Sequence, residues 1–335
     1  MKFVIPGGTG HLGTILTRQL ESEGHQVVIL TRGPNKPNHV AWDGKNLGPW
    51  ADEVDGCDAV INLAGRTVDC RYTAANLAQM MDSRVDSTRV IGEAVAVAET
   101  PPPVWLQMST ATLYAHRFDA ANDEATGTIG GQEPGAPARW RPSIDIAKAW
   151  EAALHAANTP HTRRVLLRTA MVMSPKKGGV FDVLSRLTRM GLGGPMAGGR
   201  QFVSWIHPVD FHRAVQRIIA DETIEGPINL AAPGPLPQRE FMAIMRRAWG
   251  VPFGLPATAW MLEIGAFFLR TDTELLLKSR RVVPGRLEAL GFEFQYGSWS
   301  DAAPDLVRRR RARSPRAAPR LGLTDRGRCR DSAGG

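Results

Sequence analysis

Residues 1–13 read MKFVIPGGTGHLG, and this stretch decides the fold. A short apolar run, Phe3 to Ile5, leads into a glycine-rich turn, and a helical pattern follows directly. Glycine suits such a turn because it adopts dihedral angles that other residues avoid and lets a pyrophosphate approach bare backbone. The helix that begins there offers unpaired N–H groups to phosphates. We therefore predict a dinucleotide site formed by Gly7, Gly8, Thr9, Gly10, His11, Leu12 and Gly13.

The second predicted strand, residues 26–31, indicates which dinucleotide binds. It ends at Thr31 and Arg32, where the adenosine ribose would lie. An acidic residue there would bind the ribose 2′-hydroxyl of NAD, whereas an arginine can hold a 2′-phosphate. The sequence therefore favours NADP(H) over NAD(H), with Thr31 and Arg32 at the cofactor. The alternative is that Arg32 is an ordinary surface charge.

The first two thirds of the chain alternate apolar strands with helices, which is typical of right-handed βαβ units. The expected fold class is α/β, a doubly wound parallel sheet of the NAD(P)-binding Rossmann type. The expected strands are residues 3–6, 26–31, 59–63, 104–109, 164–169 and 228–230. The expected helices are residues 12–23, 75–98 and 144–156.

Two domains and a tail follow from this pattern. Residues 1–175 are expected to form the Rossmann domain, with a strand near 228–232 returning to its sheet. Residues 176–304 have more Gly and Pro and less strand alternation, which predicts a smaller, mostly helical substrate lobe interleaved with the first domain. It would cover the carboxyl edge of the sheet, where ligands bind.

Three later segments also belong to the predicted cofactor site. The strand at 59–63 ends in small residues, so the dinucleotide can pass close to Leu63, Ala64 and Gly65. Arg84 on the long helix can offer a positive group to the phosphates or serve as a structural ion-pair partner. The strand near 164–169 leads to Val172, which we place beside the nicotinamide.

Composition sets the remaining bounds. The chain has 335 residues, 43% hydrophobic and 22% charged, as in ordinary globular proteins. Its three cysteines show neither paired nor metal-like spacing, which predicts a reducing compartment and no metal site. The sequence contains no leader-like segment and no apolar stretch long enough for a bilayer, so we expect a cytoplasmic protein without membrane contact.

The positive charge is concentrated at the end of the chain. Ten arginines and three aspartates between residues 305 and 335 contribute +7 of the net +8, so about +1 remains for the rest. This segment lacks aromatic residues and apolar periodicity, which predicts a disordered basic tail. A uniformly basic surface for specific nucleic-acid binding is therefore not expected.

Taken together, the motifs resemble an extended (atypical) short-chain dehydrogenase/reductase. More narrowly, residues 1–300 are similar to the NAD(P)-dependent epimerase/dehydratase-like family that ends in a C-terminal domain of unknown function. The matching motifs are Gly7 to Gly13, Asn62 to Gly65, Ser83-Arg84, Gly191 to Pro195, Gly199 to Phe202, Ser204 to Asp210, Val282 to Phe292 and Gln295-Tyr296.

The resemblance implies a catalytic hydroxyl, a tyrosine and a lysine four residues later. Thr110, or Ser109, matches the hydroxyl that orients the substrate. The Tyr-xxx-Lys motif is absent. Aligning the helix on its glutamate places Ser143 at the tyrosine position and Ala147 at the lysine position. Lys148 is one residue away, which turns it by about 100° around a helix.

Tyr114 is expected to be the only tyrosine near the predicted site. It can act as a substitute acid with Lys148 nearby, or it can be a packing residue. The arginine with which nucleotide-sugar epimerases grip a diphosphate is also missing before Ser204, so a nucleotide-sugar substrate is disfavoured. His207 is expected to be structural rather than a base.

Two functions follow from the sequence. The first is an NADP(H)-dependent oxidoreductase or epimerase acting on a small carbonyl or hydroxyl compound, with Thr110, Tyr114 and Lys148 as catalytic residues. The second is a catalytically inactive NADP(H)-binding sensor or regulatory protein. A homodimer through the helices at 75–98 and 144–156 is possible.

Overall fold

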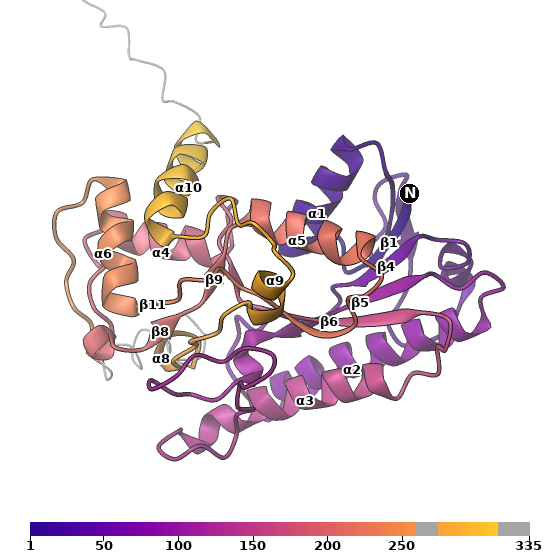
Figure 1. The fold of residues 1–335 in the computed structure, drawn as a ribbon, viewed down its shortest axis with the longest axis horizontal. Coiled ribbons are helices and arrows are strands. Elements are labelled where there is room, and N and C mark those ends of the chain that lie inside the picture. Colours follow the sequence, from indigo (N-terminus) through magenta and orange to yellow (C-terminus); the bar gives the residue numbers. More distant parts are fainter. Residues whose placement is uncertain (259–260, 262–273, 314–335) are drawn as a thin grey trace, which may run out of the picture.

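The structure, a computed structural model, describes residues 1–258, 261 and 274–313 (Figure 1). Its centre is a sheet of seven parallel strands in the order β10-β6-β5-β4-β1-β2-β3. These strands are β1 (Lys2–Pro6), β2 (Gln26–Thr31), β3 (His39–Ala41), β4 (Ala59–Asn62), β5 (Val104–Thr110), β6 (Arg163–Thr169) and β10 (Gly226–Leu230). The strand order reverses between β1 and β4, and open α/β sheets bind ligands beyond the carboxyl ends of the strands at such a point.

Helices cover both faces of this sheet. α1 (His11–Ser22) and α5 (Pro208–Ala220) lie on one face, and α2 (Ala74–Val97) and α3 (Arg141–His155) lie on the other (Figure 1). Each helix turns an apolar stripe to the strands, which forms two hydrophobic cores with the sheet between them. The prediction of a doubly wound parallel sheet is confirmed.

A second lobe lies beside one edge of the sheet. Its main helices are α4 (Val180–Arg189), α6 (Gln238–Trp249) and α10 (Trp299–Arg313), and they share a core that contains Phe181, Phe241 and Trp299 (Figure 1). Short elements connect the lobe to the sheet: β7 (Met171–Val172), β8 (Phe202–Val203), β9 (Trp205–Ile206), β11 (Leu236–Pro237), α8 (Glu274–Leu277) and α9 (Gly285–Ala289).

The sequence-based assignment differs from the structure at one domain border and at one strand. α5 lies in the predicted substrate lobe, yet its buried residues Phe211, Ala214 and Val215 belong to a core of the sheet. Residue 175 is therefore not a clean border between the domains. The short strand β3 has no counterpart among the predicted strands, because three residues give too little alternation to recognise.

The expected disordered tail from residue 305 is wrong for its first nine residues, which form the end of α10. Leu306 and Val307 are buried against the second lobe, and Asp305 is buried among basic groups. Composition alone missed this helix because its apolar residues are few among the arginines. Residues 314–335, the remainder of the predicted tail, lie outside the described residues.

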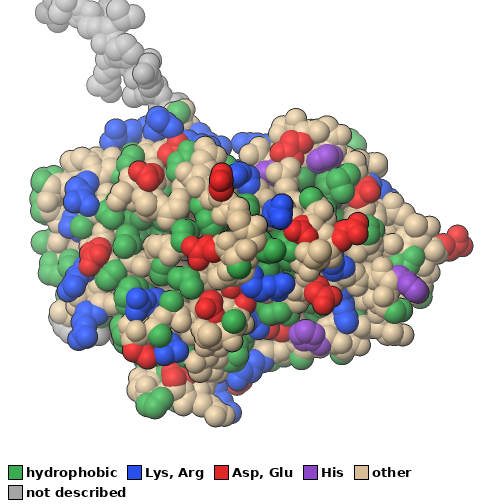
Figure 2. Space-filling model, viewed as in Figure 1, with side chains coloured by type: hydrophobic (Ala, Val, Ile, Leu, Met, Phe, Trp, Pro, Cys, Tyr) green, Lys and Arg blue, Asp and Glu red, His purple; other side chains and the backbone are tan. Residues whose placement is uncertain are grey.

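The described surface carries both signs of charge. Figure 2 shows acidic and basic side chains intermixed over one face of the molecule. In the part of the chain that the structure describes, no helix combines the length and apolarity needed to cross a bilayer.

Candidate functional site

The glycine-rich turn after β1 is packed so tightly that side chains have no room. Gly7 has φ of +74°, and a Cβ there would lie 2.9 Å from the backbone of Ala64. A Cβ on Gly13 would lie 2.4 Å from Cα of Gly8. α1 therefore starts directly against the strand, as it does in dinucleotide-binding turns. Its N-cap is Gly10, which supplies no side-chain acceptor to the first N–H groups.

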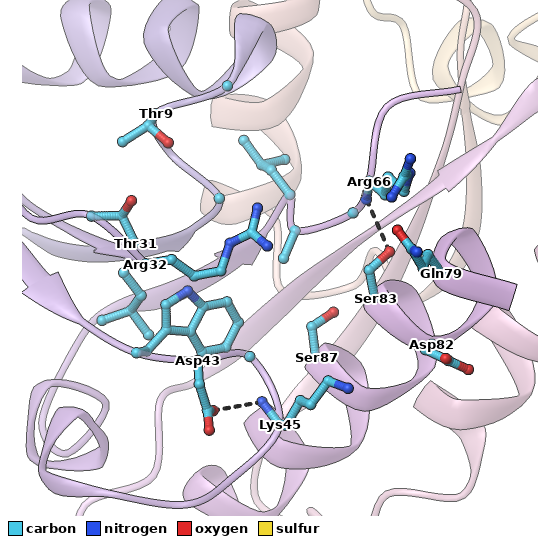
Figure 3. Close-up of a pocket in the computed structure, with 18 residues that line it drawn as sticks. Thr9, Thr31, Arg32, Asp43, Lys45, Arg66, Gln79, Asp82, Ser83 and Ser87 are labelled. Carbon is cyan, nitrogen blue, oxygen red and sulfur yellow. Dashed lines mark hydrogen bonds between the residues drawn. The ribbon is translucent and has the colours of Figure 1, made fainter. Parts of the chain in front are cut away.

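A first cavity of about 490 Å³ opens at the carboxyl ends of β1, β2 and β4 (Figure 3). Eight of the predicted cofactor residues line it: Gly7, Thr9, Gly10, Thr31, Arg32, Leu63, Ala64 and Gly65. Among the residues that the sequence reasoning missed are Trp42, Asp43, Lys45, Arg66 and Ser87. The glycine-rich turn after β1, the end of β2 and the residues after β4 therefore meet at this cavity.

The remaining predicted residues of the turn do not line this cavity. Gly8 and Gly13 are buried in the contact between strand and helix, where they allow the close approach. His11 packs against Gly179, and its buried Nε2 has no hydrogen-bond partner among the described residues. Burial, with the nearby charge of Lys176, lowers the pKa of His11. Leu12 lines a second cavity instead.

Two basic side chains line the first cavity near the ends of β2 and β3. Arg32 is exposed at the end of β2, and Lys45 follows β3 on another part of the same wall (Figure 3). The neighbouring carboxylate of Asp43 accepts hydrogen bonds from backbone N–H groups of Lys45 and Asn46 and from the Asn46 amide. These hydrogen bonds lower the pKa of Asp43 to about 2 and fix its carboxylate within the turn formed by residues 43–46.

A second cavity of about 240 Å³ lies at the carboxyl ends of β5 and β6. Thr110 and Val172 line it, as predicted for residues beside the nicotinamide and the substrate. The Thr110 hydroxyl accepts a hydrogen bond from the N–H of Thr112, so its own proton remains available for donation. Ser109 lines the same cavity, but its hydroxyl donates a hydrogen bond to the carboxylate of Glu151.

Arg84 lines the second cavity and not the first. Its side chain is only 9% exposed and lies over the ring of Trp150, with Cζ 4.9 Å from the ring centroid. Its Nη1 donates to the carbonyl oxygen of Met80. Burial lowers the pKa of Arg84 to about 10. Among the described residues it has no carboxylate partner, so the ion-pair alternative is not supported.

Tyr114 is misassigned as a catalytic acid. Its side chain is 2% exposed and does not line the second cavity. The hydroxyl donates to Asn229 at 3.0 Å and accepts from Arg168 at 3.0 Å, and Arg168 in turn forms an ion pair with Glu151. Burial raises the pKa of Tyr114. Its role is to join β5, β6 and β10 beneath the site.

Lys148 is misassigned as well. It is exposed on α3, whereas Ser143 and Ala147 on the same helix line the second cavity. The helix thus points the positions of the missing tyrosine and lysine at the cavity, and the 100° turn carries Lys148 away from it. The structure therefore brings Ser143 and Ala147 to the cavity, and it does not bring Lys148 there.

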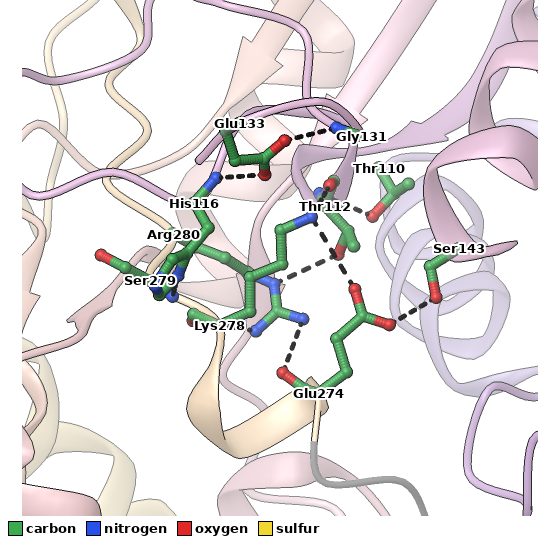
Figure 4. Close-up of polar contacts among 10 residues, drawn as sticks. All are labelled: Thr110, Thr112, His116, Gly131, Glu133, Ser143, Glu274, Lys278, Ser279 and Arg280. Carbon is green, nitrogen blue, oxygen red and sulfur yellow. Dashed lines mark hydrogen bonds and ion pairs between the residues drawn. The ribbon is translucent and has the colours of Figure 1, made fainter. Parts of the chain in front are cut away.

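The C-terminal segment fills the space behind Ser143. Glu274 accepts a hydrogen bond from the Ser143 hydroxyl, and Glu274 and Arg280 both line the second cavity (Figure 4). Lys278 Nζ lies 3.7 Å from Glu274 Oε1. Burial lowers the pKa of Lys278 to about 8. Sequence reasoning missed this group, since no local pattern joins Glu274 to a helix 131 residues earlier.

His207 has the structural role that the sequence suggested. It is fully buried, its Nδ1 accepts from the N–H of Val209 at the start of α5, and its Nε2 lies 3.2 Å from Asp305. Asp210 accepts from the backbone N–H groups of Gln295 and Tyr296. The motif around His207 therefore attaches α10 to the sheet domain.

Two protein-family models match this chain. Residues 3–231 match the NAD dependent epimerase/dehydratase family, and residues 257–306 match a domain of unknown function, DUF1731. The epimerase family protein SDR39U1 of Bos taurus is 29% identical over 92% of this chain and all of its own length. An epimerase family protein of Staphylococcus epidermidis is 30% identical over 92% of this chain and 99% of its own.

Solved structures agree with the sequence matches. The crystal structure of human epimerase family protein SDR39U1 with NADPH has a TM-score of 0.80 and 27% identity, covering 92% of this chain and 99% of that one. A UDP-N-acetylglucosamine 4-epimerase from Bacillus cereus, at 16% identity over 93% of this chain and 99% of its own, shares the fold with a TM-score of 0.69. With its parallel sheet, glycine turn and matched C-terminal domain, this chain belongs to the NAD dependent epimerase/dehydratase family.

Proposed function

We propose that the protein binds NADP(H) and carries out epimerase-type or oxidoreductase chemistry on a small carbonyl or hydroxyl compound. The observation that carries this proposal is the junction of the two cavities. Gly65 lines the first, and a Cβ on it would lie 3.3 Å from Cζ of Arg84, which lines the second. A dinucleotide can therefore extend from Arg32 to the hydroxyl-bearing end of β5.

The residues present fit such a cofactor. The turn leaves bare backbone at Gly7 and Gly10, and the helix N-terminus has no side-chain cap, so its N–H groups and positive dipole suit a pyrophosphate. Arg32 and Lys45 supply two cations where NADP differs from NAD. Human SDR39U1, which was crystallised with NADPH, supports the same choice.

The second cavity supplies the groups for proton transfer. A bound NADP(H) would deliver or accept the hydride. Thr110 can donate its hydroxyl proton to the substrate oxygen. During oxidation of a hydroxyl compound, Ser143 would take the substrate proton while passing its own to Glu274; in reduction the same proton returns to the oxygen.

Titration of the purified chain with NADPH and NADH, followed by fluorescence, tests the cofactor. We expect NADPH to bind in the micromolar range and Arg32→Asp to weaken it by about 1–3 kcal/mol, with little effect on NADH. Arg247→Asp, a change in an exposed arginine of α6 that lines neither cavity, is the matched control. Equal binding of both nucleotides, or of neither, would contradict the proposed NADP(H) preference.

The alternative function is a sensor that binds NADP(H) without turnover. The observation that favours it is that the described lining of the second cavity contains Tyr72 but no lysine. A panel of small aldehydes, ketones and alcohols separates the two functions. Oxidation of NADPH or reduction of NADP+ that Ser143→Ala removes supports the enzyme, whereas tight binding with no turnover supports the sensor.

A further inference from the structure

We propose that the second cavity binds a carboxylate group of the substrate and that Arg84 is the residue that holds it. This inference rests on the proposed function and narrows its substrate to a small carbonyl or hydroxyl acid. It follows from a buried positive charge that the described protein leaves without a counter-charge.

Arg84 is the group with the uncompensated charge. Its side chain is only 9% exposed, and it lies in the wall of a cavity among Met80, Met108 and Trp150. A charge removed from water costs several kcal/mol unless it is paired. Among the described residues no carboxylate pairs with this guanidinium. The nearest groups that can carry negative charge are Tyr72 and Cys70, which are ordinarily neutral near pH 7.

The other charges around this cavity balance one another. Glu274 lies beside Lys278 and Arg280, and Glu133 acts on Lys278 from the opposite side (Figure 4). This group therefore contains two acidic and two basic residues. Among the described residues, Arg84 remains as one extra positive charge on the cavity wall, which calls for a ligand with one negative charge.

The geometry suits a carboxylate. Nη1 of the guanidinium donates a hydrogen bond to the carbonyl oxygen of Met80, and one face of the guanidinium lies over the ring of Trp150. Among the described residues, no hydrogen-bond acceptor is found for Nε or Nη2. Two adjacent N–H groups of arginine match the two oxygens of a planar carboxylate. The cavity volume of about 240 Å³ lies below the roughly 300–1,000 Å³ typical of sites for drug-sized ligands, so the acid must be small.

Calorimetric titration with simple carboxylates tests the inference. The NADP+-saturated protein is titrated with acetate and pyruvate, and with methyl pyruvate as a neutral probe. We expect pyruvate to bind at least about tenfold more tightly than its ester, and Arg84→Met to abolish that preference. Arg84→Lys should retain part of it, and Arg89→Met, on the exposed side of the same helix, should retain all of it.

Thermal unfolding without any ligand provides a second measurement. Because the charge is uncompensated, Arg84→Met should raise the melting temperature by about 2 °C or more, and the carboxylates should raise that of the wild type. Failure of both carboxylates to bind, equal binding of pyruvate and its ester, or an unchanged preference in Arg84→Met would overturn the proposal.

Titration with NADP+ shows whether a failure concerns the carboxylate site or the proposed cofactor binding. The affinity for NADP+ is measured in the wild type and in Arg84→Met. A loss of tenfold or more would overturn the proposal and assign Arg84 to the cofactor phosphates. If the wild type binds carboxylates but no nucleotide, the proposed function fails while the carboxylate site stands.

Discussion

The hydroxyl of Ser143 donates a hydrogen bond to the carboxylate of Glu274, which lies 131 residues further along the chain. Ser143 occupies the position at which related enzymes are expected to have their catalytic tyrosine. Glu274 comes from the segment that matches the C-terminal domain of unknown function. That domain therefore supplies a carboxylate to the cavity at the carboxyl ends of β5 and β6.

Glu274→Gln should abolish most of the turnover of any substrate that the carbonyl panel identifies. An amide keeps the shape but cannot take the proton from Ser143, and general acid–base catalysis is worth about 10²–10⁴-fold. The affinity for NADPH should stay unchanged. Lys148→Ala, an exposed change on α3, is the control and should leave kcat intact. Wild-type turnover in Glu274→Gln would show that the carboxylate only positions Ser143.

Gly13→Ala should destabilise the fold by about 1–3 kcal/mol or more, since its Cβ would lie 2.4 Å from Cα of Gly8 and neither backbone can yield. Gly33→Ala is the matched control, because a Cβ there meets nothing within 4 Å and should change stability by less than ~0.5 kcal/mol. Urea denaturation measures both. Equal stability of the two variants would mean that the close approach of α1 to β1 is not required.

Tyr114→Phe should reduce stability and leave turnover unchanged. The change removes the bonds to Asn229 and Arg168 inside the protein, which costs about 1–3 kcal/mol because both partners lose a hydrogen bond. Denaturation and kcat are measured on the same sample. A large fall in kcat at unchanged stability would restore Tyr114 as a catalytic acid.

Stability should fall in mild acid through His207. Burial lowers the pKa of this side chain from 6.5 to about 4 in the folded protein. Between these values the unfolded chain binds the proton and the folded one does not, so the free energy of unfolding decreases as the pH falls from about 6.5 to about 4. Asp305, whose pKa is also lowered, adds to the loss below its unfolded pKa.

Melting temperatures across this range provide the measurement. His207→Asn retains an acceptor for the N–H of Val209 but cannot titrate. Its melting temperature should therefore decrease less than that of the wild type between pH 6.5 and pH 4. Parallel curves for the two proteins would assign the acid sensitivity to other groups.

The sequence by itself determined most of the sheet and eight of the eighteen residues that line the first cavity. Gly7, Gly10, Thr31 and Arg32 could be placed because they lie at or shortly after the ends of strands whose apolar pattern is visible locally. In a parallel sheet the carboxyl ends of neighbouring strands meet at one edge, so locating those ends locates the site. The register of α3 came from the family resemblance, by aligning Glu151 with the glutamate that follows the Tyr-xxx-Lys motif.

Only the tertiary structure decided which groups complete the second cavity. A pattern of 3.6 residues assigns Ser143 and Lys148 to different sides of a helix, but it cannot say which side faces the cavity. Tyr114 lies close in sequence to Thr110, yet the 3-10 turn between them directs it into the core, where it bonds to Asn229 and Arg168. Lys45, Glu274 and Asp305 reach their places through packing between distant segments, and such long-range contacts leave no local signal in the sequence.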